Sequence, residues 1–409
     1  GAHEPLLLRC HPLTIYRHKV LKQPDLVLAS FLLHDWFSAA DRLRAFDFYD
    51  PLTTGDSSLS APVQCITSAA AGYPETAYGY FRLTCLSDTA DVHGNTKDGL
   101  HLAAAAGTWL SVVYGFLGLH DRGAVPRFFP RYPKTSGWTS LTAKLLLRGN
   151  LVELTLKPDE MIYVLKEGKD AALTHEYTPV TLKKPGDISS HSLVPKLEAV
   201  IFDLDGVITD TAEFHYLAWK KIADELGLPF DRELNHRLRG IGRMESLAVI
   251  IENARADISG ERRAELAARK NGYYREYLET LTPEDLLAGI EDLLEDLKKD
   301  GVKTALASAS KNAQLVLSKL KAGGLFDTVI DAGRITVGKP DPEIFLKAAE
   351  LLETPCRNCA GIEDAQAGID AIRAAGMVSV GIGSRLRDAD LVLGGTEELT
   401  LPALRKLFS

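Results

Sequence analysis

Long basic stretches are absent from this sequence. Its 409 residues include 47 lysines and arginines against 55 aspartates and glutamates, which gives a formal net charge of −8 at pH 7. Proteins whose main partner is a nucleic acid usually present clustered positive charge to the phosphates. The sequence therefore favours other partners, and we expect no nucleic acid among them.

Cysteine is scarce as well, and its five positions lack the spacing of a disulfide framework: Cys10, Cys65, Cys85, Cys356 and Cys359. Few and scattered thiols are typical of a reducing compartment, so we predict a cytoplasmic location. The last two form a single C-x-x-C with no second pair or histidine near them in the sequence. Ordinary buried thiols are therefore favoured over a zinc or redox site.

No signal peptide is expected, because the amino terminus lacks a basic segment followed by an apolar core. The segment 102–119 is almost continuously apolar and is long enough to suggest a membrane span. It contains four consecutive alanines and three glycines, with no lysine or arginine bias at its ends. A helix packed between other helices has the same pattern, so we expect that structure and no membrane association.

The first part of the chain, residues 1–122, has the pattern of helices joined by irregular loops. Residues 20–33 and 74–86 are predicted helices, with Pro24 and Pro74 in their first turns.

The period of the pattern then changes, and residues 123–182 predict a small, β-sandwich-like domain. Segments 144–148 and 151–157 alternate on either side of Gly149-Asn150, which is typical of a β-hairpin. Residues 183–196 are polar and contain proline and glycine, so they predict a linker to the next domain.

From residue 197 to residue 409, strand and helix patterns alternate, so the protein is predicted to be multidomain. Short apolar strands are expected at 199–204, 302–307, 328–331, 359–362 and 378–382. A long helical insertion separates the first two strands. Alternating elements predict an α/β domain with a doubly wound parallel sheet, which binds its ligands at the carboxyl ends of the strands.

Polar clusters stand where these ligands would bind. Asp203 and Asp205 end the first strand, where side-chain alternation and a turn at Gly206 let both point into one crevice. Later clusters are Ser308-Ala309-Ser310-Lys311-Asn312, Gly338-Lys339-Pro340-Asp341 and Glu363-Asp364. Hydroxyls, a lysine and helix amino termini suit a phosphate, and converging carboxylates require a cation such as Mg²⁺. A carboxylate that lies beside a bound phosphate and Mg²⁺ can attack phosphorus and form an aspartyl-phosphate.

Each cluster also has an ordinary structural interpretation when it is taken alone. The serines can cap a helix, Glu363 and Asp364 can lie in a loop, and Lys339 can be a solvated surface lysine. Their joint placement at strand ends makes the catalytic interpretation the stronger one.

Three stretches, FDLDGVITDTAE at 202–213, ALASASKN at 305–312 and GIEDAQAGI at 361–369, carry a family resemblance. They resemble the haloacid dehalogenase-like phosphotransferases, and among these the β-phosphoglucomutases. The resemblance implies that Asp203 is the nucleophile and that Asp205 is the general acid and base. It also implies a Mg²⁺ site of Asp203, Asp205, Glu363 and Asp364. Phosphate or substrate contacts would come from Ser308, Ala309, Ser310, Lys311, Asn312 and Lys339.

The same resemblance makes the insertion at about 213–284 a helical cap. Thr211 and His215 would belong to the catalytic group, at a hinge that ties cap position to the general acid. Arg239 and Arg243 would hold the phosphate that is not reacting. Well-known members of the family carry lysine where this chain has Arg239. A planar guanidinium group therefore replaces a compact ammonium group at this position.

The implied reaction interconverts β-glucose 1-phosphate and glucose 6-phosphate through an aspartyl-phosphate and β-glucose 1,6-bisphosphate. A sugar-phosphate phosphatase is the alternative, because the same core also hydrolyses phosphoesters. A mutase must keep water from its aspartyl-phosphate while the bisphosphate reorients. The histidine and arginines of the cap favour the mutase.

A second resemblance covers residues 1–182. The stretches LKQPDLVL at 21–28, YDPLTTGDSSLS at 49–60 and GNTKDGLHLAAAAGTW at 94–109 resemble the disaccharide phosphorylases of glycoside hydrolase family 65. These helices would then be the end of a partial α/α barrel. By this resemblance, Lys22 and Gln23 contact sugar, and Ser57, Ser58 and His101 bind phosphate. From the residues alone, the run at 56–58 is more simply a helix cap.

The segment that carries the catalytic glutamate of those longer enzymes is not found in this sequence, so we expect no phosphorylase activity. Gly55 also replaces the bulkier residue expected before Asp56. Bare helix faces of a partial barrel would pack on the mutase-like domain, on another copy of the chain, or on an upstream phosphorylase portion. A carbohydrate-binding or assembly module is the alternative. The presence of a phosphorylase-like and a mutase-like part in one chain has chemical sense. These phosphorylases release β-glucose 1-phosphate, which is the substrate of the mutase.

Overall fold

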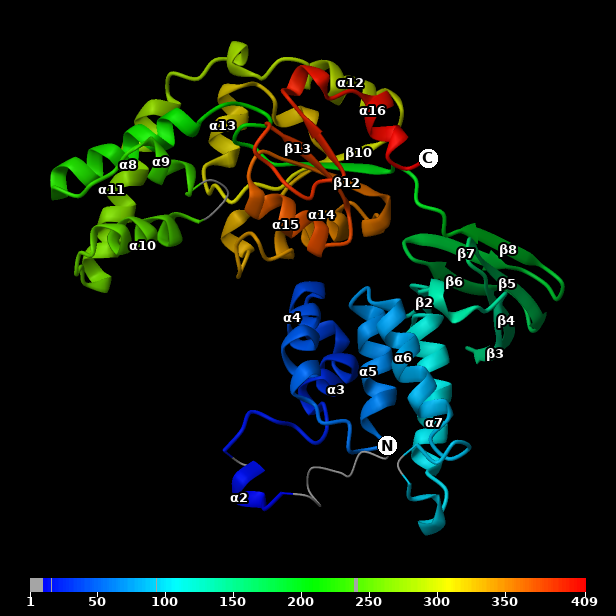
Figure 1. The fold of residues 1–409 in the computed structure, drawn as a ribbon. Coiled ribbons are helices and arrows are strands. Elements are labelled where there is room, and N and C mark those ends of the chain that lie inside the picture. The colour runs from blue at the N-terminus through cyan, green and yellow to red at the C-terminus, as the bar shows by residue number, and fades with distance from the viewer. Residues whose placement is uncertain (1–9, 16, 93, 239–241) are drawn as a thin grey trace. The chain divides into compact units, whose positions relative to one another are not determined.

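The computed structural model describes residues 10–15, 17–92, 94–238 and 242–409 (Figure 1). The chain divides between Val194 and Pro195 into two compact units. Each unit has its own apolar core.

Helices make up the first part of the amino-terminal unit. They are α2 Pro12–Ile15, α3 Asp25–Leu32, α4 Ala39–Tyr49, α5 Ser60–Ala70, α6 Pro74–Cys85 and α7 Leu102–Leu110. Helix α6 begins at its proline, as the sequence predicts, whereas α3 begins only after Pro24. Leu21 instead forms a β-bridge with Thr53, so the segment before α3 is extended.

The apolar segment 102–119 is not a single helix buried on all sides. Helix α7 continues as a π-helix over Ser111–Phe116, and the chain then enters β1. Gly107 is buried so tightly that an added Cβ would overlap Pro62 of α5. Leu102 and Trp109, by contrast, are 75% and 50% exposed. The buried face of α7 is therefore narrow, formed by Ala104 and Gly107, and its large residues face outward. No helix among the described residues is long and apolar enough to cross a membrane.

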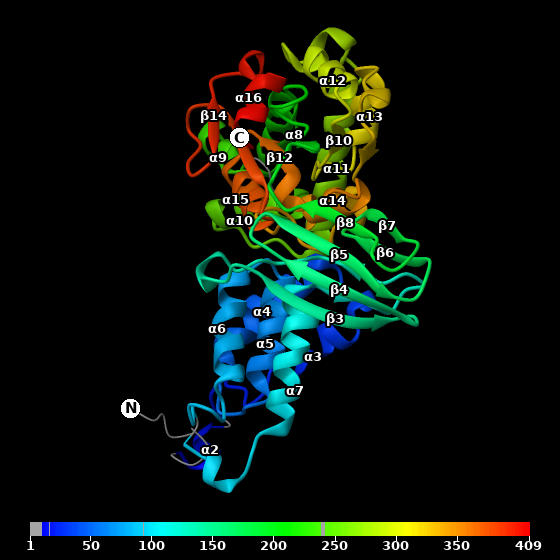
Figure 2. The same cartoon turned by 90° about the vertical axis from the view of Figure 1, so that its right-hand side faces the viewer.

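Two four-stranded sheets complete this unit, in the orders β1-β2-β6-β7 and β3-β4-β5-β8. Figure 2 shows the strands of the second sheet side by side. The strands of the two sheets are β1 Leu119–His120, β2 Arg127–Phe128, β3 Leu141–Leu147, β4 Asn150–Leu156, β5 Glu160–Glu167, β6 Ala171–His175, β7 Thr178–Leu182 and β8 Ile188–Ser192. The hairpin of β3 and β4 turns at Arg148 and Gly149, which both have positive φ as a tight two-residue turn requires.

Strand β8 lies inside residues 183–196, so the linker expected there is shorter. It pairs antiparallel with β5 at the edge of its sheet. Its sequence, ISSHS, is mostly polar, because neither face of this edge strand is fully buried. Backbone pairing rather than an apolar pattern therefore defines the strand.

The carboxyl-terminal unit is built on a six-stranded parallel sheet with the order β11-β10-β9-β12-β13-β14. Its strands are β9 Ala199–Phe202, β10 Lys303–Leu306, β11 Thr328–Val329, β12 Cys359–Glu363, β13 Val378–Ile382 and β14 Leu391–Leu393. This confirms the predicted doubly wound parallel sheet and adds β14 to it. Strand order reverses between β9 and β12, and in sheets of this kind the ligand crevice lies beyond the carboxyl ends of the strands at that point.

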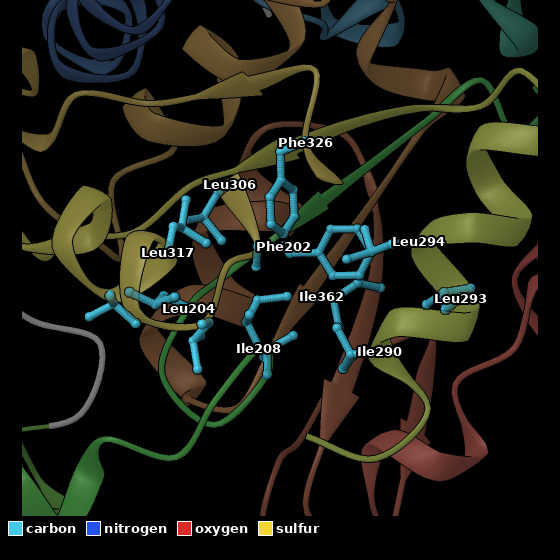
Figure 3. Packing of buried hydrophobic residues seen from close by; sticks show 14 of the residues in the cluster. Phe202, Leu204, Ile208, Ile290, Leu293, Leu294, Leu306, Leu317, Phe326 and Ile362 are labelled. Atoms are coloured by element: carbon cyan, nitrogen blue, oxygen red, sulfur yellow. The ribbon is translucent and has the colours of Figure 1, made fainter. Parts of the chain in front are cut away.

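Both faces of the sheet are covered, as the alternation along β9 requires. Val200 and Phe202 pack with one apolar cluster, and Ala199 and Ile201 pack with another. The first cluster, drawn in Figure 3, includes residues of α12 Ile290–Lys299 and α13 Ala313–Lys319. The second includes α14 Glu343–Leu351 and α15 Gln366–Ala374.

The insertion after β9 forms a separate helical layer with its own core. Its helices are α8 Ala212–Leu226, α9 Arg232–His236, α10 Arg243–Ala254 and α11 Gly260–Leu278. Trp219, Leu247 and Leu266 belong to the apolar cluster that holds these helices together. This layer, called the cap below, returns the chain to the sheet through α12.

Candidate active site

The loop after β9 brings Asp203 and Asp205 to the crevice between β9 and β12. Asp203 N donates to Ile362 O at 2.9 Å, which extends the pairing of the two strands by one residue. Gly206 then turns the chain with φ +79°, and an added Cβ there would overlap the Asp364 carboxylate. Glycine is therefore required for both its conformation and its lack of a side chain.

Lys339 joins two buried carboxylates in this crevice. Its Nζ lies 2.5 Å from Asp203 Oδ1 and 2.7 Å from Glu363 Oε2. Burial alone would lower the pKa of Lys339, but the two carboxylates outweigh it and raise that pKa well above its usual value. Lys339 is therefore a permanent ammonium group beside Asp203, not a solvated surface lysine.

Three carboxylates meet at the same place. Asp203, Glu363 and Asp364 each offer an oxygen, and these atoms lie within 4.8 Å of one another. Burial, and next the charge of Asp203, raises the pKa of Glu363 despite its bond to Lys339. One ammonium group does not balance three carboxylates, so a hard divalent cation with oxygen ligands fits this set.

Asp205 faces the hinge of the cap. Thr211 Oγ1 donates to its Oδ1, and His215 Nε2 lies 3.8 Å from its Oδ2. Removal from water, together with the neighbouring charge of Asp203, raises the pKa of Asp205 to about 6. The carboxyl group can therefore hold or release a proton near neutral pH, as general acid–base catalysis requires.

Lys270 of α11 is a member of this network that sequence reasoning missed. Its Nζ lies 2.6 Å from His215 Nδ1, and Nζ also sits 5.1 Å from the Trp219 ring centroid and 4.7 Å from that of Tyr274. Burial, and next the charge of Arg243, lowers the pKa of Lys270 to about 7.

A signal for Lys270 was nevertheless present. Leu266, Ala267, Lys270 and Tyr274 follow one another at helical spacing, and all four are buried. A lysine within an apolar stripe requires a polar partner, and here that partner is His215. Tyr274 closes the network, because its hydroxyl donates to Thr211 Oγ1 at 3.2 Å.

The hydroxyl cluster after β10 lies next to the nucleophile candidate. Ala307 N donates to Phe202 O at 2.7 Å, which places Ser308 beside the start of the β9 loop. Ser308 is buried, and its Oγ accepts from Ser310 N at 3.1 Å. Ala309 and Asn312 are half-buried and Lys311 is exposed, so the cluster becomes more exposed along the chain from Ser308 to Lys311.

Of the two cap arginines, Arg243 is among the described residues and Arg239 is not. Arg239 lies outside the described residues, as do Gly240 and Ile241. Arg243 begins α10 and is half-buried, and burial lowers its pKa. Its charge also lowers the pKa values of His215 and Lys270, so it lies near the same network.

In the amino-terminal unit, only part of the second candidate site comes together. Gln23 Nε2 donates to Ser57 Oγ at 3.2 Å, and Ser60 Oγ donates to Lys22 O at 3.2 Å. His101 instead pairs with Asp88, its Nδ1 lying 2.6 Å from Oδ1.

Helix α5 starts at Ser60, and no side chain caps it. Ser57 Oγ accepts from Leu59 N at 3.3 Å, so the run at 56–58 caps the turn that leads into the helix and not the first residue of the helix itself. No hydrogen bond among the described residues joins His101 to Ser57 or Ser58.

Residues 197–376 match the model of haloacid dehalogenase-like hydrolases. The β-phosphoglucomutase of Bacillus subtilis (strain 168) is 49% identical over 214 residues, covering 51% of this chain and 95% of that protein. The chain belongs to the haloacid dehalogenase-like family. A crystal structure of β-phosphoglucomutase from Clostridium difficile covers 52% of this chain and 97% of its own, with 47% identity and a TM-score of 0.51. The carboxyl-terminal unit is thus a β-phosphoglucomutase homologue, and its enzyme class is isomerase.

The rest of this haloacid dehalogenase-like chain matches a different family. Residues 1–110 match the central catalytic domain of glycosyl hydrolase family 65, and residues 119–182 match its C-terminal domain. The α,α-trehalose phosphorylase of Thermoanaerobacter brockii is 37% identical over 180 residues, which is 44% of this chain. The chain covers 23% of that phosphorylase, so it spans about a quarter of its length.

Proposed function

We propose that the carboxyl-terminal unit interconverts β-glucose 1-phosphate and glucose 6-phosphate through a phosphorylated Asp203 and a β-glucose 1,6-bisphosphate intermediate. The observation that carries this proposal is the position of Asp203. It is buried between an ammonium group and two further carboxylates, two residues before a second acid with a raised pKa.

Asp203 is suited to attack phosphorus because both of its oxygens are held. Oδ1 bonds to Lys339 Nζ, and Oδ2 accepts from Asp205 N at 3.0 Å. Asp203, Glu363 and Asp364 would hold Mg²⁺, with a further oxygen from the Asp205 carbonyl. When bound, Mg²⁺ would offset the negative charges of the carboxylate and the phosphate, which otherwise repel each other.

Asp205 is suited to move the proton of the sugar hydroxyl. It would accept that proton when the hydroxyl attacks the aspartyl-phosphate, and it would donate one when a sugar oxygen leaves. Thr211 and His215 fix its orientation from the hinge, so its catalytic position depends on the position of the cap.

Two groups of residues would hold the two phosphates of the intermediate. Ser308, Lys339 and the backbone of Ala309 would hold the phosphate that is transferred. Arg243, Arg239 and the segment Ser310-Lys311-Asn312 would hold the one that is not. Each phosphate of the intermediate must in turn occupy both binding positions. We therefore expect a cationic group and hydroxyl groups at each position.

The test supplies β- and α-glucose 1-phosphate separately, with Mg²⁺ and a trace of β-glucose 1,6-bisphosphate. We expect glucose 6-phosphate from the β-anomer alone, and loss of both turnover and phosphoenzyme in Asp203→Asn. Release of inorganic phosphate without glucose 6-phosphate would favour the phosphatase instead.

For the amino-terminal unit we propose an inactive phosphorylase-like module that binds carbohydrate or supports assembly. The incomplete cluster around Gln23 and Ser57, with His101 paired elsewhere, supports this reading. Incubation with trehalose, maltose or kojibiose and inorganic phosphate should yield no glucose 1-phosphate. Phosphorolysis of any of these sugars would contradict the proposal.

A further inference from the structure

Helix α11 of the cap and helix α13 of the core are joined by a hydrogen bond between two asparagines. Asn312 Nδ2 donates to Asn271 Oδ1 at 2.8 Å, and both side chains are half-buried. Asn271 follows Lys270 directly, so the bond lies next to the network around Asp205. Asn271 belongs neither to the phosphate cluster, residues 308–312 with Lys339, nor to the metal cluster of Asp203, Glu363 and Asp364.

The Asn312 side chain bonds to the cap and makes no bond to its own helix. It occupies the N-cap position of α13, where asparagine commonly bonds to its own helix. No side-chain bond caps α13 here. The bond that the Asn312 amide donates goes to the cap.

Asn271 lies part-way along α11, next to Lys270, whose Nζ reaches His215 at the hinge. It precedes the end of α11 at Leu278 by seven residues, or about 10 Å along the helix axis. Near that end, Lys319 of α13 forms a second bridge to Glu279, at 2.5 Å and largely in solvent. The cap and the core are therefore bridged at two separate points along α11 and α13.

We propose that Asn271 is a positioning residue whose bond to Asn312 latches the closed cap over the phosphate cluster. The inference rests on the proposed mutase function. Asn312 directly follows Ser308-Ala309-Ser310-Lys311, so the latch closes beside the expected phosphate. Its effect is to slow hydrolysis, in which a water oxygen bonds to phosphorus, the bond from phosphorus to the Asp203 oxygen breaks, and inorganic phosphate leaves.

The experiment compares the full-length protein with Asn271→Ala and with Asn253→Ala, which removes an exposed asparagine of the cap helix α10. Each protein is phosphorylated with acetyl phosphate and Mg²⁺, and the lifetime of the phosphoenzyme is measured. The ratio of inorganic phosphate to glucose 6-phosphate formed from β-glucose 1-phosphate is measured in parallel. Asn271→Ser serves as a second variant should the alanine variant be poorly folded.

We expect Asn271→Ala to shorten the phosphoenzyme lifetime by about three- to tenfold, as the loss of one neutral hydrogen bond allows. The phosphate ratio should rise by a similar factor, and Asn253→Ala should match the unmodified protein. In Asn312→Ala, the further change Asn271→Ala should have no added effect on the lifetime, because the bond is already lost.

Lifetimes and phosphate ratios equal to those of Asn253→Ala would overturn the latch. Failure of the mutase proposal would look different. The unmodified protein would then form no glucose 6-phosphate, while Asn271→Ala would still shorten the phosphoenzyme lifetime.

Discussion

Lys339 and Asp203 form a buried ion pair whose two atoms lie 2.5 Å apart, although the residues are 136 positions apart in the chain. Glu363 shares the same ammonium group. This arrangement makes Lys339 both a structural counterion and a phosphate ligand candidate.

We expect Lys339→Ala to destabilise the fold, because it leaves buried carboxylates without their counterion. Such losses cost about 3–5 kcal/mol in the free energy of unfolding. Urea titration in EDTA measures the loss, and added Mg²⁺ should recover part of it by occupying the carboxylate cluster.

Lys347→Ala is the matched control, since its lysine pairs with Glu350 in solvent, at 46% and 60% exposure. It should change the free energy of unfolding by about 0–1 kcal/mol. Equal losses for the two variants would show that burial of the Lys339 pair carries no energetic weight.

The pKa of Asp205, about 6, predicts where the pH–rate profile of the reaction falls on its acid side. Attack of a sugar hydroxyl requires the carboxylate form, so kcat/KM should fall as pH decreases through 6. Lys270 lowers the pKa of Asp205 by its charge. Lys270→Met should therefore move this fall to higher pH, which a pH–rate profile in saturating Mg²⁺ would show. A fall that moves to lower pH contradicts the assignment.

Lys270 itself predicts a pH dependence of stability. Its pKa is about 7 in the folded protein against an ordinary value of 10.5, so between these values the unfolded chain binds more protons. Stability relative to Lys270→Met should then rise with pH in this window, by up to about 1.4 kcal/mol per pH unit.

Chemical denaturation at pH 7, 8 and 9 checks this difference. Lys221→Met, which replaces an exposed lysine of the cap helix α8, should show no such trend. A difference that stays constant with pH would mean that Lys270 keeps its ordinary pKa in the fold.

Gly206 predicts a specific effect on metal binding. In Gly206→Ala the added Cβ would push on Asp364, so we expect weaker Mg²⁺ binding, measured by titration calorimetry. Gly227 has a similar positive φ, +65° against +79°, with nothing near its missing Cβ. Gly227→Ala should therefore cost about 1 kcal/mol of stability through backbone strain alone and leave Mg²⁺ affinity unchanged. Equal affinities in both variants would show that Asp364 is not a ligand.

The strand-end residues could be predicted from the sequence because the rules behind them are local. An apolar run, an Asp-x-Asp and a following glycine define where Asp203 and Asp205 emerge, and parallel sheets gather such ends at one edge. Lys270 and Asn271 could not be placed in this way. Their partners depend on how α11 packs against α8 and α13, which is a matter of tertiary contacts and not of spacing.

The weaker predictions in the amino-terminal unit failed for a related reason. Strand β8 has little apolar signal because it is an edge strand, and α7 exposes residues that composition alone would bury. Which face of a helix is covered depends on neighbours that the local sequence does not encode.

The separation of the site residues along the chain has a consequence for synthesis. Asp203 leaves the ribosome long before Lys339 and Glu363, so a nascent chain carries this carboxylate without its counterion or the neighbouring carboxylates. The cluster of Asp203, Glu363 and Asp364 forms only when β12 has joined the sheet beside β9. We therefore expect this unit to bind Mg²⁺ only after its two central strands, β9 and β12, have paired.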